Sequence, residues 1–175
     1  MTASEVLSFP KRRLWRLLFL LTATIGSDQF SKYLAREFLP PSGSSHLFGM
    51  VRLSLIENHG GFLGVVAGLP AEWRFVLLTV GVAVLLGGCL VILLRLLDHA
   101  SPLWLPLAMI TGGGLGNLLD RLRGDGGVTD FLILGRGFLQ TGIFNLADVY
   151  ILTGSFILGV QLLQGPDQPR EPRRD

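Results

Sequence analysis

Long apolar runs separated by short polar connections dominate the chain. The runs that are long enough for a membrane helix cover residues 14–34, 75–94, 103–121 and 143–163. Residues 75–94 contain no charged side chain, and about 20 apolar residues are what a helix needs to cross a hydrocarbon core ~30 Å thick. The pattern therefore predicts a membrane α-helical fold with four transmembrane helices.

Two stretches between these runs have a different pattern. Residues 40–69 combine PPSGSS, short runs with alternating hydrophobicity at 46–56, and a glycine-rich end, which favours a small β-rich element outside the hydrocarbon. Residues 123–142 are also glycine-rich, and we expect a loop with a short strand there. Residues 166–175 are charged and proline-rich, which predicts a disordered tail. Residues 1–165 are expected to form one integral membrane domain.

Composition supports a membrane protein and excludes several other classes. Of 175 residues, 16% are charged and 49% are hydrophobic, whereas soluble domains carry about 25% charged residues. The net charge of +2 is small and the arginines are scattered, so no nucleic-acid partner is expected. Cys89 is the only cysteine, which excludes a disulfide framework, and no two histidines stand at ligand spacing. We expect no metal and no cofactor.

Charge at the ends of the apolar runs predicts the topology. Four spans place both termini on one side of the membrane, and the basic N-terminal flank makes that side cytoplasmic by the positive-inside rule. The basic flank and first apolar run also resemble a secretory signal peptide, but the further spans argue against that interpretation. Residues 40–69 and 123–142 then face the outside.

Polar residues inside the runs recur at helical spacing. Three sets each lie on one helix face, at the end of the run that the topology places outside: Asp28 with Lys32, Asn117 with Asp120 and Arg121, and Asn145 with Asp148. Ionisable groups near a membrane are costly and are functional candidates by default. A purely structural network of ion pairs remains an alternative at this point.

Two aspartates are left without a partner when each basic residue in the runs is paired with the acid near it in sequence. Lys32 and Arg121 can neutralise Asp28 and Asp120, whereas Asp130 and Asp148 have no basic partner nearby in sequence. Like charges at close range cannot both ionise, so such a pair shares a proton and can perform the general acid–base chemistry of aspartic proteolysis. Spacing leaves open whether the two meet; a turn role for the first and a helix N-terminal role for the second are the alternatives.

These residues resemble, in order, the motifs of the lipoprotein signal peptidase (signal peptidase II) family. The matching stretches are Asp28-Gln29 with Lys32, Asn58 with Gly60, GGGLGNLLDR at 112–121, VTDF at 128–131 and FNLAD at 144–148. The resemblance implies an aspartic endopeptidase of the bacterial inner membrane, with four transmembrane helices, an extracytoplasmic β-cradle and a site toward the periplasmic face. Its implied substrate is a prolipoprotein, cleaved on the N-terminal side of a diacylglyceryl-modified cysteine.

The resemblance also implies a role for each matched residue. Asp130 and Asp148 match the catalytic pair. The positions that match residues lining or supporting the site are Asn58, Gly60, Asn117, Arg121 and Asn145, with structural or substrate-orienting roles at Asp28, Lys32 and Asp120. Membrane lipid and the lipid-modified substrate are the expected partners, and we expect a monomer.

The chain departs from the family pattern at one place. The family usually reads N-x-G-A-A-F, whereas this chain reads Asn58-His59-Gly60-Gly61-Phe62-Leu63-Gly64. The departure leaves the catalytic motifs intact and affects the β-cradle. Two other classes compete with the peptidase: a small transporter whose carboxylates relay protons or cations, and a non-catalytic membrane scaffold. No inverted repeat supports the transporter.

Overall fold

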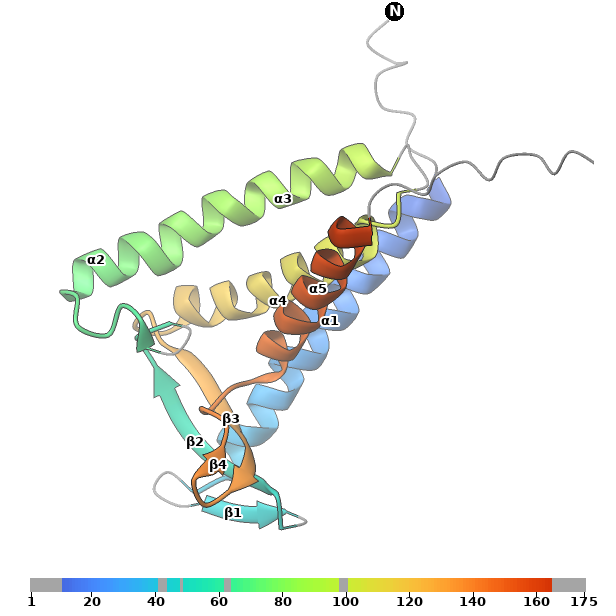
Figure 1. The fold of residues 1–175 in the computed structure, drawn as a ribbon. Coiled ribbons are helices and arrows are strands. Elements are labelled where there is room, and N and C mark those ends of the chain that lie inside the picture. The colour runs from blue at the N-terminus through green and yellow to red at the C-terminus, as the bar shows by residue number, and fades with distance from the viewer. Residues whose placement is uncertain (1–10, 41–43, 48, 62–63, 98–100, 165–175) are drawn as a thin grey trace, which may run out of the picture.

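The chain folds into a helical bundle with a small antiparallel sheet at one end (Figure 1). The computed structural model describes residues 11–40, 44–47, 49–61, 64–97 and 101–164, so the predicted tail at 166–175 lies outside the described residues. The helices are α1 (Lys11–Phe38), α2 (Ala71–Phe75), α3 (Val82–Leu96), α4 (Trp104–Arg123) and α5 (Leu146–Gln164). The strands are β1 (Ser44–Leu47), β2 (Val51–Asn58), β3 (Val128–Arg136) and β4 (Leu139–Gln140).

The predicted spans correspond to helices, and two of them meet a membrane criterion by length and hydropathy. A short π-helix, Val76–Gly81, joins α2 to α3 into a continuous helical segment, Ala71–Leu96, and an 18-residue window of this segment has a mean hydropathy of 2.8. Helix α5, Leu146–Gln164, is the second candidate, with 1.7. Both segments are long and apolar enough to cross a membrane. Helix α1 carries charged side chains toward both ends and α4 carries them at its C-terminal end, which lowers their hydropathy.

Helix α4 packs against the other long helices because glycines remove side chains from its contact faces. A Cβ at Gly113 would lie 2.5 Å from the Ala147 carbonyl oxygen of α5, and one at Gly114 would lie 2.6 Å from Leu86 of α3. A Cβ at Gly116 would lie 2.6 Å from Asp28 Oδ2 of α1. The GGGLG stretch thus lets three neighbours approach the α4 backbone, as small residues do between membrane helices.

The sheet has the order β1-β2-β3-β4, and every pairing is antiparallel. In the central pair, Ile56 of β2 lies opposite Asp130 of β3, with a register shift between Leu53 and Ile56. The β-rich element predicted for residues 40–69 is therefore present up to Asn58. The strand expected within residues 123–142 is present but longer than predicted: β3 covers nine residues, and Asp130 lies inside it, not in a turn.

The sheet meets the bundle where α1 and α4 end and α5 begins (Figure 1). Backbone pairing makes this junction: Phe144 N–H donates to the Leu132 carbonyl at 3.0 Å, and Leu132 N–H donates back to Phe144 at 2.9 Å. Because Phe144 directly precedes Asn145, this bridge fixes the start of α5 beside Asp130.

Replacing Gly113 with alanine is expected to destabilise the bundle. The added Cβ meets a backbone oxygen, which cannot rotate away, so α4 and α5 must separate, at a cost of about 1–3 kcal/mol. Thermal unfolding in detergent measures the effect. Gly87→Ala on α3 is the matched control, since nothing lies within 4 Å of its Cβ position. Equal melting temperatures for the two variants would contradict the close packing at Gly113.

Candidate functional site

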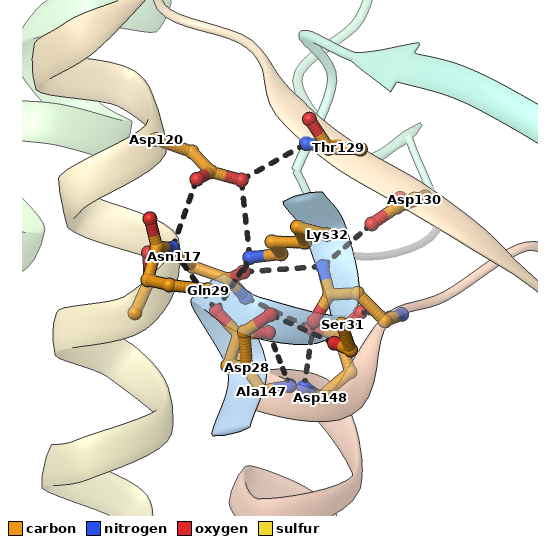
Figure 2. Close-up of polar contacts among 12 residues, drawn as sticks. Asp28, Gln29, Ser31, Lys32, Asn117, Asp120, Thr129, Asp130, Ala147 and Asp148 are labelled. Carbon is orange, nitrogen blue, oxygen red and sulfur yellow. Dashed lines mark hydrogen bonds and ion pairs between the residues drawn. The ribbon is translucent and has the colours of Figure 1, made fainter. Parts of the chain in front are cut away.

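A fully buried lysine lies at the centre of the polar residues (Figure 2). Lys32 Nζ contacts Asp28 Oδ2 at 2.8 Å, Asp120 Oδ2 at 3.1 Å and Asn117 Oδ1 at 2.8 Å. An ammonium group has three donors, and each has an acceptor here. A buried charge is tolerated only when it is paired and hydrogen-bonded. The predicted Asp28–Lys32 pair is confirmed, and Lys32 joins α1 to α4.

The two acids that pair with Lys32 also bind backbone N–H groups of other elements. Asp28 Oδ1 accepts the Ala147 N–H at 2.9 Å, and Asp120 Oδ2 accepts the Thr129 N–H at 3.1 Å. Ala147 directly precedes Asp148, and Thr129 directly precedes Asp130. The Lys32 cluster (Asp28, Lys32, Asn117 and Asp120) therefore fixes the backbone on the N-terminal side of Asp148 and Asp130. We call these two the surplus aspartates, because neither has a basic partner nearby in sequence.

Helix α5 begins with a reciprocal cap. The Asp148 N–H donates to Asn145 Oδ1 at 3.0 Å, and the Asn145 N–H donates to Asp148 Oδ2 at 3.1 Å. This is the capping-box arrangement, in which the residue before the helix and the third helical residue satisfy each other. The Asn145–Asp148 spacing noted in the sequence is thus a local consequence of starting a helix, and it holds the Asp148 carboxylate in place.

Asparagine side chains connect the two surplus aspartates. Asn145 Nδ2 donates to Asp130 Oδ1 at 2.6 Å and to Asn117 Oδ1 at 3.1 Å. Asn117 Nδ2 donates to Asp148 Oδ1 at 3.0 Å. Both carboxylates therefore contact Asn145, which is fully buried. The residues that the sequence left without a basic partner are held by neutral amides, which orient them without neutralising them.

Asp130 receives its second amide from a turn at the end of β2. Asn58 Nδ2 donates to Asp130 Oδ2 at 2.9 Å. The same side chain shapes the turn, because Asn58 Oδ1 accepts the Gly60 N–H at 2.9 Å and Nδ2 also reaches the Gly61 carbonyl at 3.2 Å. A Cβ at Gly60 would lie 3.0 Å from Ala67 Cβ, so this glycine allows the turn to fold back. The altered positions Phe62 and Leu63 lie outside the described residues.

Burial changes the acidity of Asp130. Its side chain is 1% exposed, and loss of solvation raises its pKa from 3.8 to about 6. Hydrogen bonds from Asn58 and Asn145 oppose this shift, while the negative charge of Asp148 adds to it. A carboxyl group with this pKa can hold a proton near neutral pH and release it during a reaction.

The partner expected for Asp120 was wrong. Asp120 pairs with Lys32 and, at 3.4 Å, with Arg36 Nη2, and within the described ranges no ion pair joins it to Arg121. Arg121 is 9% exposed, and its Nε finds no hydrogen-bond partner in the described part of the chain. Its guanidinium interacts electrostatically with Asp148, Asp130 and Asp120. Arg121 therefore interacts with both surplus aspartates without forming an ion pair with either in the described part of the chain.

Two supporting residues were not assigned a role from the sequence. Arg36 Nε donates to Thr129 Oγ1 at 3.0 Å, and Gln29 Nε2 donates to Asp120 Oδ1 at 3.0 Å. Arg36 stands four residues after Lys32, so helical spacing puts both on one face of α1. That spacing was the available signal for Arg36.

A separate group of side chains has the chemistry of a metal site. The ligand atoms of Glu57, His59 and Asp125 all lie within 4.8 Å of one another. Asp125 is exposed, in the turn between α4 and β3. The sequence search for histidine pairs missed this group because two of its three ligands are carboxylates.

Replacing Lys32 with methionine is expected to destabilise the protein by about 3–5 kcal/mol, because two buried carboxylates would lose their common cation. Thermal unfolding in detergent measures the loss. Lys11→Met, at an exposed position of α1, is the control and should change stability by less than about 0.5 kcal/mol. A Lys32→Met protein as stable as the control would show that the cluster does not hold the fold.

Comparison with known proteins identifies a family for the whole chain. The family model described as Signal peptidase (SPase) II matches residues 20–164. A lipoprotein signal peptidase of Moorella thermoacetica is 38% identical over 89% of this chain and 98% of its own length, and one of Syntrophus aciditrophicus is 33% identical over 85% and 93%. A solved bacterial membrane enzyme has the same fold, with a TM-score of 0.72 and 19% identity over 91% of this chain and 94% of its own. The chain belongs to the signal peptidase II family.

Proposed function

We propose that this protein is an aspartic endopeptidase that removes signal peptides from prolipoproteins, with Asp130 and Asp148 as the catalytic pair. One observation carries the proposal: both carboxylates contact Asn145, and neither has a lysine or arginine ion pair in the described part of the chain. Acids that serve only the fold, such as Asp28 and Asp120, are paired with cations here. The absence of such pairing for Asp130 and Asp148 supports a chemical role.

The surroundings of the two carboxyl groups suggest which one acts as the base and which one as the acid. Asp148 accepts two N–H donors and lies in the first turn of α5. Asp130, with its raised pKa, holds the proton. Asp148 accepts a proton from water, the water oxygen attacks the peptide carbonyl carbon, and Asp130 protonates the carbonyl oxygen. Asp130 then takes back a proton from one hydroxyl of the tetrahedral intermediate while Asp148 gives its proton to the leaving amine, and the C–N bond breaks to leave the carboxylic acid.

Arg121 and Asn58 are proposed to bind substrate beside this pair. The buried Arg121 Nε has no partner within the described residues, so a peptide carbonyl group would satisfy it. Asn58 shapes the turn after β2 and contacts Asp130, which brings that turn to the site. Extended peptide bound along the sheet would present its scissile bond to the carboxylates.

The membrane setting supports a lipid-modified substrate. Two helices are apolar enough to span a bilayer, and the site lies where the bundle meets the sheet (Figure 1). We propose that α1 and α4 also span, that both termini are cytoplasmic, and that the site faces the periplasmic side of the inner membrane. A diacylglyceryl cysteine would then keep its acyl chains in lipid while the bond on its N-terminal side reaches Asp130 and Asp148.

Asp130→Asn and Asp148→Asn are each expected to lower the kcat/KM of prolipoprotein cleavage by about 10²–10⁴-fold, because an amide can neither donate nor accept the required proton. Purified protein in detergent, given a lipid-modified prolipoprotein, provides the measurement. Glu72→Gln removes an equivalent charge at an exposed position of α2 and should retain activity. Protein level and melting temperature are measured in parallel to exclude unfolding.

Cleavage at the wild-type rate by both variants would refute the aspartic pair. A folded wild-type protein that does not cleave prolipoprotein would instead favour the transporter or scaffold alternatives.

The pH dependence follows from the raised pKa of Asp130. The mechanism needs Asp130 protonated, so kcat/KM is expected to fall about tenfold per unit as pH rises above about 6. Stability has the same sign: a raised carboxyl pKa favours folding at low pH, and this contribution is lost as pH rises from 3.8 to about 6. Asp130→Asn should flatten that part of the stability curve. Rates that stay constant across this range would contradict the role of Asp130.

A further inference from the structure

Three side chains from separate segments form a cluster outside the site described above. Glu57 is in β2, His59 follows its end, and Asp125 lies in the turn between α4 and β3. His59 Nε2 lies 3.7 Å from Asp125 Oδ1, and the three ligand atoms lie within 4.8 Å of one another. In the described ranges neither carboxylate forms an ion pair with lysine or arginine. The two acids therefore have His59 as their shared neighbour.

Glycine at position 127 makes room for this cluster. A Cβ there would lie 2.5 Å from Glu57 Cγ and 2.8 Å from His59 Cε1. Its neighbour Gly126 adopts a φ of +94°, a backbone conformation that glycine tolerates and other residues rarely adopt. The turn after α4 is thus shaped so that two of the three side chains lie against its backbone, and the third, Asp125, comes from the turn itself.

We propose that Glu57, His59 and Asp125 bind a divalent transition-metal cation, with Zn²⁺ as the best-matched ion. Imidazole nitrogen with carboxylate oxygens is a donor set that Zn²⁺ accepts. Tetrahedral zinc with bonds of about 2.0–2.1 Å places its ligands about 3.4 Å apart, close to the His59–Asp125 separation of 3.7 Å. Three protein ligands leave a fourth position for water. The histidine makes a hard cation such as Ca²⁺, which prefers only oxygen ligands, a poorer match.

The bound cation would join the turn after β2 to the turn before β3. Asn58 stands between two of the ligands in sequence and donates to Asp130 Oδ2 at 2.9 Å. Binding is therefore expected to hold Asn58 against Asp130. This coupling rests on the proposed function, whereas the binding itself does not, so binding is tested without substrate.

Calorimetric titration of ZnCl₂ into the metal-free full-length protein in detergent tests the site. Wild type is expected to bind one Zn²⁺ per chain, and His59→Gln and Asp125→Asn are each expected to weaken binding at least tenfold. Asp125 has a side chain that is 72% exposed, so its substitution leaves the fold intact. Matched controls are His46→Gln for the histidine and Glu72→Gln for the charge; both should bind as wild type does.

Zn²⁺ should also raise the melting temperature of wild type and leave that of Asp125→Asn unchanged. The assignment is overturned if wild type binds no Zn²⁺, if His59→Gln and Asp125→Asn bind it as tightly as wild type, or if Ca²⁺ or Mg²⁺ binds equally well. If the wild-type protein binds Zn²⁺ but does not cleave prolipoprotein, the result counts against the proposed peptidase and leaves the Zn²⁺ site standing.

Discussion

The ammonium group of Lys32 is the constraint on which the rest of the structure depends. A buried cation needs an acceptor for each of its three protons, and Asp28, Asp120 and Asn117 provide them. Those acceptors come from α1 and α4, and the two acids in turn accept N–H groups from α5 and β3. One charge therefore sets the relative positions of three helices' ends and a strand (Figure 2).

The polar residues form one network with two parts, one that holds the fold together and one that we propose performs the chemistry. The Lys32 cluster is the first part, in which every charge is paired. The second part is built on it through neutral amides: Asn117 and Asn145 hold Asp148 and Asp130 while leaving their charges unneutralised. Amides suit this task because they fix a carboxyl group and still allow its protonation to change during a reaction.

Local spacing in the sequence predicted the parts of this network that lie within one helix. The Asp28–Lys32 pair follows from helical periodicity alone. The same reasoning associated Asn145 with Asp148, although Asn145 precedes α5 and caps it instead of lying on its face. Long-range contacts gave no such signal: Asp120 meets Lys32 of another helix, so proximity to Arg121 in sequence was misleading. The length of the strand around Asp130 was underestimated, because residues 128–131 are buried without alternation, and the period of two that reveals a half-buried strand is lost.

A structure determined in a lipid phase, at a resolution that shows ordered water, tests whether the Lys32 cluster holds Asp130 and Asp148 on either side of one reactive water. We expect a water within about 3 Å of both carboxyl groups, with Lys32 Nζ contacting Asp28, Asp120 and Asn117. Carboxyl groups too far apart for one water to bridge, or a Lys32 that pairs elsewhere, would contradict it.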